Sequence, residues 1–446
     1  KSFIDRTTMY RLMLYYLLAL FIAALAASAA GYLNIPFSAL LWSIAVLAIS
    51  AWISNKLFAR VFNAVTNVES SLITALILAL ILVPAEFSDI NGSIVLASVS
   101  VIASASKYVL VFRKRHIFNP VALALALSAP LLGVQTAWWA SGSFFLIPFI
   151  LIGGLMVAYK LQKFGLITAF FVSSFITIAL ISPNFVAGVQ AAFLYSAIFF
   201  FAFVMLTEPL TQPNTRALRI VYGILIGVLF IWSPSIISLH FSPELALIAG
   251  NLFAFFAEQN GRYTLSLIKR NQLASGVYEY IFHSDSKIIF KSGQYLEWTL
   301  GGVPSDNRGN RRFFTIASAP EDEDIALATR FSDKPSPVRD KDSWSPGRPL
   351  VGVFNGASAF KKTLAELPIG AVIHASSLAG DFVMPKDVRE KLAFIAGGIG
   401  VTPFASMARH CIKTDEYRDI KLLYSSKTEN EVAYKDVFTN ASRNGW

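Results

Sequence analysis

The stretch RRFFTIASAP, from Arg311 to Pro320, places two arginines at the start of an apolar strand and small, hydroxyl-bearing residues near its end. Further strand-like stretches lie on both sides of it. Together they occupy residues 263–270, 277–284, 293–300, 311–319, 324–331 and 350–356. Short stretches of β-branched and aromatic residues between Gly and Pro turns are typical of antiparallel sheets. Six of them in this spacing predict a small antiparallel β-barrel.

The pattern changes at about Lys391. The segment KLAFIAGGIGVTPFASMARH (391–410) is an apolar strand, a glycine turn and a helix, and a second apolar strand, IKLLYSS (420–426), follows it. This order predicts the opening of a parallel α/β nucleotide-binding unit. Two parallel strands alone would leave a bare apolar edge. We therefore expect the natural chain to continue beyond Trp446.

The barrel strand and the glycine turn together strongly resemble the ferredoxin–NADP reductase family, in which an Arg-x-aromatic-Ser/Thr strand precedes a glycine-rich βα unit. This resemblance implies FAD and NAD(P)H as cofactors. It makes Arg312 the partner of the FAD pyrophosphate, because a guanidinium offers parallel donors to phosphate oxygens. Phe314 takes the place of the aromatic residue, usually tyrosine, that packs on the isoalloxazine. Thr315 matches the residue that faces flavin N5, and Phe313 and Ser318 complete the predicted contacts of this stretch.

Two further segments carry predicted nucleotide contacts. FNGASAF contributes Gly356 and Ser358 before a helix start, where free N–H groups suit phosphate. In the resemblance, the glycine turn admits the nicotinamide and its pyrophosphate, and Thr402 lies near the ring, so Thr315 and Thr402 are the predicted catalytic positions. The predicted contacts of this turn are Gly397, Gly398, Gly400, Thr402 and Pro403.

The stretch LYSSKTENEVAY (423–434) matches the segment that recognises the adenosine ribose. Ser426 and Lys427 are candidates to bind a 2′-phosphate, but NADH-using relatives also carry basic residues here, so the choice between NADH and NADPH stays open. The family's Cys-Gly-Pro stretch is absent from this sequence. Cys411 is the single cysteine, which excludes a disulfide framework and a cluster held by four thiolates. No metal site is predicted.

The first half of the chain, up to about residue 258, is a succession of apolar segments. Each is close to the roughly 20 residues that cross a bilayer as a helix. The ten predicted crossings are 11–31, 37–57, 69–85, 93–112, 117–133, 143–160, 164–182, 186–206, 217–233 and 242–258. The predicted domains are a polytopic α-helical membrane domain (1–258), an FAD-binding β-barrel (259–385) and a truncated NAD(P)-binding α/β domain (386–446). Interrupted helices in both halves of the membrane domain indicate a possible inverted repeat.

The net charge of +10 follows the predicted topology. Lys and Arg residues gather in groups, and each gap between groups holds two apolar segments joined by a loop without either residue. This positive-inside pattern predicts a bacterial-type inner membrane protein with its N-terminus and reductase domain in the cytoplasm. It argues against nucleic acid as a partner. The histidine count also argues against a bis-histidine haem relay, because only His116 and His240 lie in this half, on opposite predicted sides.

Two stretches of the membrane half, RKRHIFNPVALALAL (113–127) and FVMLTEPLTQPNTRALRIVYGILIGVL (203–229), look like signatures of one family. It holds the B subunit of the sodium-pumping NADH:quinone reductase and the D subunit of the Rnf complex. The resemblance, over about residues 69–230, implies ten helices and a second flavin such as FMN, often attached to threonine in a Ser-Gly-Ala-Thr motif. Here Phe144 replaces that threonine, so the attachment stays open. Within the signatures, the predicted cofactor-binding residues are His116, Asn119, Thr207 and Glu208.

The two resemblances together predict a membrane-bound oxidoreductase. Electrons would pass from NAD(P)H through FAD to a membrane flavin, a quinone or a further redox protein. The alternative is a membrane channel or transporter regulated by a reductase-like redox domain, since broken helices around a central site suit either function. Two flavins per chain would favour electron transfer, whereas one flavin with solute flux would favour transport.

Overall fold

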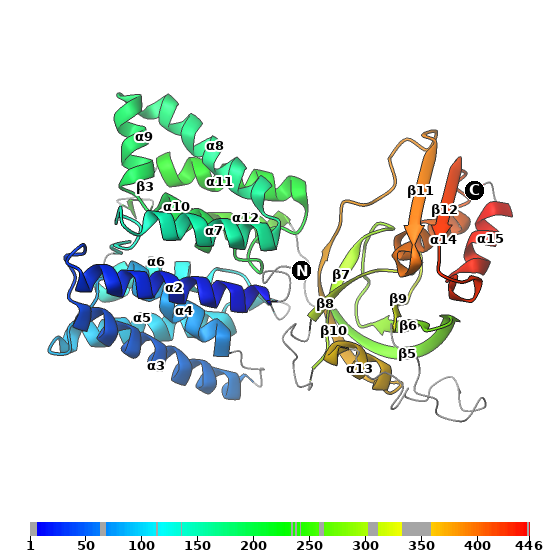
Figure 1. Cartoon of the computed structure of the whole chain (residues 1–446), viewed down its shortest axis with the longest axis horizontal. Coiled ribbons are helices and arrows are strands. Elements are labelled where there is room, and N and C mark those ends of the chain that lie inside the picture. Colours follow the sequence, from blue (N-terminus) through cyan, green and yellow to red (C-terminus); the bar gives the residue numbers. More distant parts are fainter. Residues whose placement is uncertain are drawn as a thin grey trace. The chain divides into compact units, whose positions relative to one another are not determined.

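The computed structural model divides the chain into two compact units, Lys1–Gln259 and Asn260–Trp446 (Figure 1). The first unit is helical, and the second combines a curled antiparallel sheet with a pair of parallel strands. The structure describes residues 7–62, 68–112, 115–134, 136–232, 235–236, 239–240, 242–257, 263–301, 311–331, 358–443 and 446.

The helices of the first unit differ in length. Four are long and apolar enough to cross a membrane: α2 (Met9–Ala29), α3 (Phe37–Val61), α5 (Ile90–Val109) and α8 (Phe164–Ile181). A fifth candidate is a pair bent by 61°, formed by α9 (Phe185–Leu194) and by α10 (Ile198–Phe200) with the π-helix η1 (Phe201–Met205). The others are α4 (Val68–Ile81), α6 (Pro120–Leu132), α7 (Ile147–Leu161), α11 (Arg216–Trp232) and α12 (Pro243–Ala257).

The prediction of about ten membrane spans is not supported by the described residues. Each predicted segment contains a helix, but α4, α6, α7 and α12 have only 13 to 15 residues. At about 1.5 Å per residue they rise roughly 20–23 Å, less than the roughly 30 Å of a hydrocarbon core. The prediction counted apolar residues, whereas the helices stop earlier. Helix α6, for example, begins at its Asn119 cap and ends at Gly133, whose φ of 67° is left-handed.

The two halves of the first unit contain the same order of elements. Helices α2 to α5 precede the hairpin β1–β2 and α6, while α7, α8, the bent segment and α11 precede the hairpin β3–β4 and α12. The hairpins are Val111–Phe112 with Arg115–His116 and Ser235–Ile236 with Leu239–His240. Their registers match, since Val111 pairs with His116 and Ser235 with His240. Equivalent helices also pack together, α3 on α5 and α8 on α11. This order supports the expected internal repeat.

Helix α11 packs closely on α8 through glycines one turn apart, Gly223 and Gly227. A Cβ on Gly227 would lie 2.5 Å from the Phe170 carbonyl oxygen, which is backbone and cannot move aside cheaply. We expect Gly227→Ala to lower stability by about 1–3 kcal/mol, as overpacking does. The measurement is thermal unfolding of the purified chain in detergent.

The matched control for this prediction is Gly165→Ala, at the start of α8, where a Cβ would meet nothing within 4 Å. Its midpoint should equal or slightly exceed that of the wild type, because alanine favours helix. Equal midpoints for the two variants would contradict the close approach of α8 and α11.

The second unit begins with a six-stranded antiparallel sheet in the order β8-β7-β10-β5-β6-β9. A bridge between Ile316 and Leu327 joins its two ends, so the sheet curls into a barrel (Figure 1). Helix α13 (Ala359–Glu366) buries Phe360 and Leu364 in the barrel core. The strands are β5 (Tyr263–Ala274), β6 (Val277–Ser284), β7 (Tyr295–Thr299), β8 (Arg311–Thr315), β9 (Ile325–Arg330) and β10 (Val372–Ala379).

Five of the six predicted strands are confirmed as β5 to β9. The sixth, residues 350–356, lies outside the described residues. Strand β10 was not predicted, although it lies inside the sheet between β7 and β5. Its sequence, VIHASSLA, mixes His374 and two serines with small apolar residues, and only Ile373, Ala375, Leu378 and Ala379 are buried. Such a pattern is too weak to distinguish from a loop.

The predicted strand, glycine turn, helix and second strand are confirmed in the rest of the unit. They are β11 (Leu392–Gly397), the 3₁₀ turn η2 (Gly398–Val401), α14 (Thr402–Thr414) and the parallel strand β12 (Ile420–Ser425). The short η3 (Glu429–Glu431) and α15 (Lys435–Arg443) follow. A second core joins this part to the outer face of the barrel, where Ala326 and Ala328 of β9 pack with Phe394 and Phe404.

Candidate cofactor sites

Strand β8 distributes its side chains over both faces of the barrel wall. Arg312 pairs with Trp298 and Phe314 with Leu296, and both partners are fully buried in the barrel core. Since directly opposite residues share one face, Arg312 and Phe314 lie on the inner side. The outer side carries Arg311, Phe313 and Thr315, opposite Thr299, Glu297 and Tyr295.

Strand β8 is also the last strand of the sheet. Its contact with β9 begins only at Ile316, so among the described strands none lies beside the edge of Arg311–Thr315 opposite β7. The edge of an end strand can present backbone N–H and C=O groups to a ligand. A flat ring system lying along this edge is within reach of side chains from both faces. This placement allows Arg312, Phe314 and Thr315 to contact one flavin although they do not share a face.

The two arginines of β8 have different environments. Arg311 pairs with the buried Glu297 at 3.7 Å. The Arg312 guanidinium lies 5.6 Å from the ring centre of Phe360, and its Nη1 donates to the Arg311 carbonyl at 2.6 Å. Phe314 also contacts Phe360, with ring centres 5.6 Å apart. Helix α13 therefore orients the residues that were predicted to bind the pyrophosphate and the isoalloxazine.

Phe313 and Ser318 occupy contrasting positions. Phe313 is 61% exposed and packs edge-on against Tyr295 at 5.6 Å on the outer face. Ser318 is buried, its Oγ accepts from the Ala326 N–H at 3.1 Å, and its carbonyl accepts from Ser406 at 2.6 Å. These contacts give Ser318 a structural function in the barrel wall. Its predicted contact with a cofactor stays a prediction.

The predicted phosphate site before α13 is only partly described. Ser358 is the N-cap of this helix, and its Oγ accepts from the Lys361 N–H at 3.4 Å. Gly356 lies outside the described residues. The Lys361 ammonium donates to the carbonyl of Arg330. A positively charged side chain therefore lies close to the start of this helix.

The glycine turn is open on the side where a nucleotide would approach. A Cβ on Gly397 or Gly400 would meet nothing within 4 Å, and Gly398 has a left-handed φ of 52°. Thr402 is 5% exposed and donates its hydroxyl proton to the Ile399 carbonyl at 2.7 Å, which stabilises the turn. Pro403 occupies the first turn of α14. The geometry suits close approach of a pyrophosphate to the backbone, while the Thr402 hydroxyl already has a partner.

The region of the glycine turn contains a basic residue that the sequence analysis missed. Nη1 of Arg330, the last residue of β9, lies 3.9 Å from the position a Cβ on Gly398 would occupy, and its Nη2 pairs with Glu431 at 2.8 Å. In the sequence, Arg330 resembles any charge at a strand end, and only the tertiary contact distinguishes it. Beyond β12, Ser426 donates to the Thr428 carbonyl and Lys427 is exposed.

Cys411 lies on α14, one turn before its end, and is 4% exposed. Burial raises the pKa of its thiol to about 11. The thiol is therefore protonated at neutral pH and lacks the thiolate that nucleophilic or redox chemistry needs. Its position indicates a packing role.

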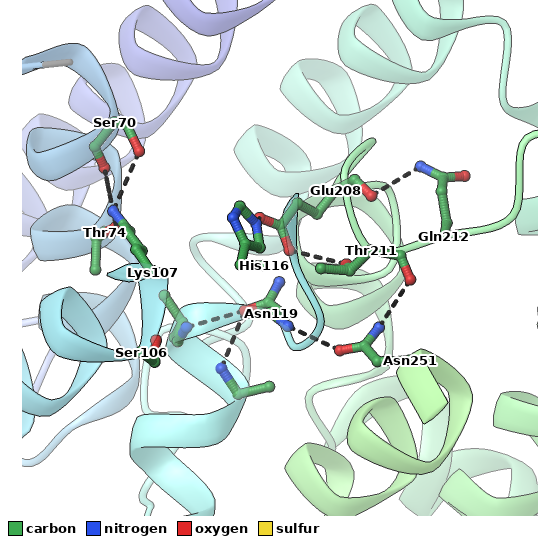
Figure 2. A network of polar contacts seen from close by, with 12 residues as sticks. Ser70, Thr74, Ser106, Lys107, His116, Asn119, Glu208, Thr211, Gln212 and Asn251 are labelled. Atoms are coloured by element: carbon green, nitrogen blue, oxygen red, sulfur yellow. Dashed lines mark hydrogen bonds and ion pairs between the residues drawn. The ribbon is translucent and has the colours of Figure 1, made fainter. Parts of the chain in front are cut away.

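In the first unit, three of the four predicted residues belong to one polar network (Figure 2). His116 Nε2 lies 3.3 Å from Glu208 Oε1, and Thr211 donates to Glu208 Oε2 at 3.0 Å. The Asn119 N–H donates to Asn251 Oδ1 at 2.8 Å, and Asn251 Nδ2 donates to the Thr211 carbonyl at 3.2 Å. The network links the first half of the unit to the second.

Thr207 is fully buried beside this network, but its hydroxyl donates to the Phe203 carbonyl at 2.8 Å. Lys107 was not predicted as a site residue, but its ammonium contacts Thr74 Oγ1 at 2.8 Å and Ser70 Oγ at 3.1 Å (Figure 2). Its place near a helix end made it look like an ordinary interfacial charge. Elsewhere in this unit, residues 141–144 (SGSF), where the attachment motif was expected, border an open pocket whose lining includes Tyr32, Trp139, Ser143 and Phe145.

Comparison with known proteins agrees with the geometry of the second unit. Residues 394–444 match the oxidoreductase NAD-binding domain family. A flavohemoprotein of Candida albicans is 26% identical over 148 residues, covering 33% of this chain and 30% of the relative. The glycine betaine monooxygenase reductase subunit of Chromohalobacter salexigens is 25% identical over 177 residues, covering 39% of this chain and 42% of the relative.

The C-terminal region resembles the FAD- and NAD-binding reductases of the ferredoxin–NADP reductase and flavohemoprotein type. The matched region is thus that of an oxidoreductase. Among solved structures, the reductase GcoB of Amycolatopsis aligns with 42% of this chain and 49% of its own, at 21% identity and a TM-score of 0.31. The chain spans 29% to 45% of the length of the curated relatives given in these comparisons.

Proposed function

We propose that this chain is a membrane-bound reductase that takes hydride from NAD(P)H and passes electrons to an acceptor in its first unit. The observation that carries the proposal is the presence, in one compact unit, of the glycine turn before α14 and of β8, whose outer edge faces no other described strand. Such an edge suits a flavin, and such a turn suits a pyrophosphate at a helix start. The similarity of residues 394–444 to NAD-binding oxidoreductases supports it.

The residues of the second unit fit FAD and a nicotinamide nucleotide. Arg312 would hold the FAD pyrophosphate, Phe314 would contact the ring system, and Thr315 would place its hydroxyl near N5. Bound FAD would accept a hydride and release single electrons, which is chemistry that no side chain supplies. The backbone of Gly397, Gly398 and Gly400 would receive the nucleotide, with Arg330 close enough to contribute positive charge. Arg312 is the proposed phosphate contact because it matches the arginine of the Arg-x-aromatic-Ser/Thr strand and because its guanidinium lies against Phe360, beside Phe314.

We propose that the first unit is embedded in a bacterial-type inner membrane and that the reductase unit is in the cytoplasm. The repeated order of elements in the two halves supports an internal repeat, which we propose is inverted around the polar network. The network of His116, Asn119 and Glu208 is the proposed contact for a second flavin such as FMN, or for a quinone. The pocket beside Ser143 is a second location for the flavin.

The test uses the full chain purified in detergent. We expect released FAD in about equal amount to protein, and loss of the visible flavin absorbance when NADH or NADPH is added without oxygen. Protein without flavin, or FAD that neither nucleotide reduces, would contradict the proposal. Quantifying FMN in the same extract, and in the denatured chain by mass spectrometry, tests for the second flavin and its attachment.

The repeated halves around a polar network also favour a second candidate, a channel or transporter whose gating responds to the redox state of the reductase unit. Vesicles containing the chain separate the two functions. One flavin per chain together with solute flux would support transport, whereas two flavins and reduction of an added quinone would support electron transfer.

A further inference from the structure

One face of helix α14 forms hydrogen bonds and ion pairs with the segment that follows β8, residues 317–322. Ser406 Oγ donates to the Ser318 carbonyl at 2.6 Å, and Arg409 Nη1 donates to the Ala317 carbonyl at 2.9 Å. Two ion pairs extend the contact: His410 lies 2.8 Å from Glu321, and Lys413 pairs with Asp322. We call these four residues of α14 the α14 clamp.

The clamp connects the two proposed cofactor sites directly. Its members are spaced by three and four residues, which places them along one side of the helix. Helix α14 starts at Thr402, in the glycine turn, and the segment 317–322 starts two residues after Thr315. The element that would carry the nucleotide is therefore bonded to the strand that would carry the flavin.

Arg409 is the most strongly held member of the clamp. Its guanidinium pairs with Glu279 of β6 at 3.0 Å, and that carboxylate is 3% exposed. The Tyr434 hydroxyl donates to the same carboxylate oxygen at 3.1 Å, and the guanidinium lies 5.1 Å from the Tyr434 ring centre. Burial raises the pKa of Tyr434, so the hydroxyl remains a neutral donor. A charge-assisted network shielded from water is stiffer than surface ion pairs.

We propose that the α14 clamp is a positioning device for hydride transfer, with Arg409 as its main positioning residue. This inference rests on the proposed function. The clamp holds the glycine turn at a constant distance from the edge of β8, so that a nicotinamide bound at the turn would lie within reacting distance of a flavin bound at β8. Near-attack separations are about 3–3.5 Å, and a misplacement of about 1 Å costs on the order of 100-fold in rate.

The test compares two clamp variants, Arg409→Met and Ser406→Ala, with the control Arg389→Met. Arg389 forms an exposed ion pair with Asp387 at 3.0 Å in the same unit. The measured quantities are FAD content, the nucleotide dissociation constant and the single-turnover rate of flavin reduction by NADH or its 4-deuterated form. We expect the FAD content and the nucleotide affinity of all three variants to lie within about twofold of the wild-type values. The rate should fall about 10- to 100-fold in Arg409→Met and less in Ser406→Ala, with an increased deuterium isotope effect, and be unchanged in Arg389→Met.

Two results would contradict the proposed positioning role of the clamp. The first is that the flavin of both clamp variants is reduced at the wild-type rate and with the wild-type isotope effect. The second is loss of FAD from a folded Ser406→Ala protein, since that would indicate a binding role in place of a positioning role. If Arg409→Met does not fold, the Ser406→Ala rate decides. If neither nucleotide reduced the flavin of the wild-type chain, the proposed function itself would be refuted. The positioning role of the clamp, which rests on that function, would then be refuted as well.

Discussion

Arg312→Ala should yield a folded protein that has lost most of its FAD. In the proposed site the Arg312 guanidinium neutralises the pyrophosphate, and hydrogen bonds to charged groups contribute about 1.5–3 kcal/mol each. A loss of roughly 2–4 kcal/mol corresponds to roughly 30- to 700-fold weaker binding. The fold should survive, because the side chain is only partly buried and packs on Phe360. The measurement is the ratio of flavin to protein after purification, followed by titration of the apoprotein with FAD.

The neighbouring residue provides a matched control for this prediction. Arg311→Ala removes the same charge from the same strand but breaks only the contact with Glu297 at 3.7 Å. Such partly exposed pairs contribute about 0–1 kcal/mol, so this variant should keep its flavin. If Arg311→Ala were colourless and Arg312→Ala yellow, the flavin would lie on the outer face of β8, with Phe313 and Thr315, and the assignment of Arg312 would be wrong.

The second large effect is expected for Glu279→Ala. This substitution leaves the Arg409 guanidinium, three-quarters covered, without its carboxylate, and the Tyr434 hydroxyl without its acceptor. Removing one partner of a buried ion pair costs about 3–5 kcal/mol. For a unit of this size we expect the melting temperature to fall by roughly 6–20 °C. The measurement is thermal unfolding of the second unit in the full chain, followed by the release of flavin fluorescence.

Two comparison variants test the cause of this loss. Glu279→Gln keeps an acceptor oxygen and should destabilise less than Glu279→Ala. The double variant Glu279→Ala with Arg409→Met should lose less than the sum of the single losses, because it removes both charges. A melting temperature of Glu279→Ala within about 2 °C of the wild type would show that the network contributes little to stability.

The β-barrel strands show which elements the local sequence pattern can predict and which it cannot. Strand β6 was predicted with the bounds it has, Val277–Ser284, because bulky β-forming residues fill it and Gly276 precedes it at a φ of 69°. Strand β10 escaped prediction because its place between β7 and β5 compensates for a weak sequence. The helices show a different limit. Apolar composition located all ten segments, but α6 is shortened by its Asn119 cap and by the left-handed Gly133 at its end.

The candidate sites show the same division between motif and contact. The motif of β8 predicted a flavin strand, but the pairing of Arg311 with Glu297 and the contact of Arg312 with Phe360 became evident only from the tertiary structure. Arg330 and Lys107 were not predicted as site residues because each is a single charge whose significance depends on a distant partner. Thr402 was predicted beside the nicotinamide, and the structure adds that its hydroxyl stabilises the turn.

The sequence by itself determined the helical first half, the strand-rich barrel and the strand–turn–helix nucleotide unit. Hydrophobic periodicity, glycine turns and proline breaks act between neighbouring residues, so they can be recognised locally. Only the tertiary structure decided that β8 is the end strand of the described sheet, that α14 binds residues 317–322, and that His116 meets Glu208 across 92 positions. The physical reason is that these contacts join segments far apart in the chain. Their formation depends on how whole helices and sheets pack, which no local pattern encodes.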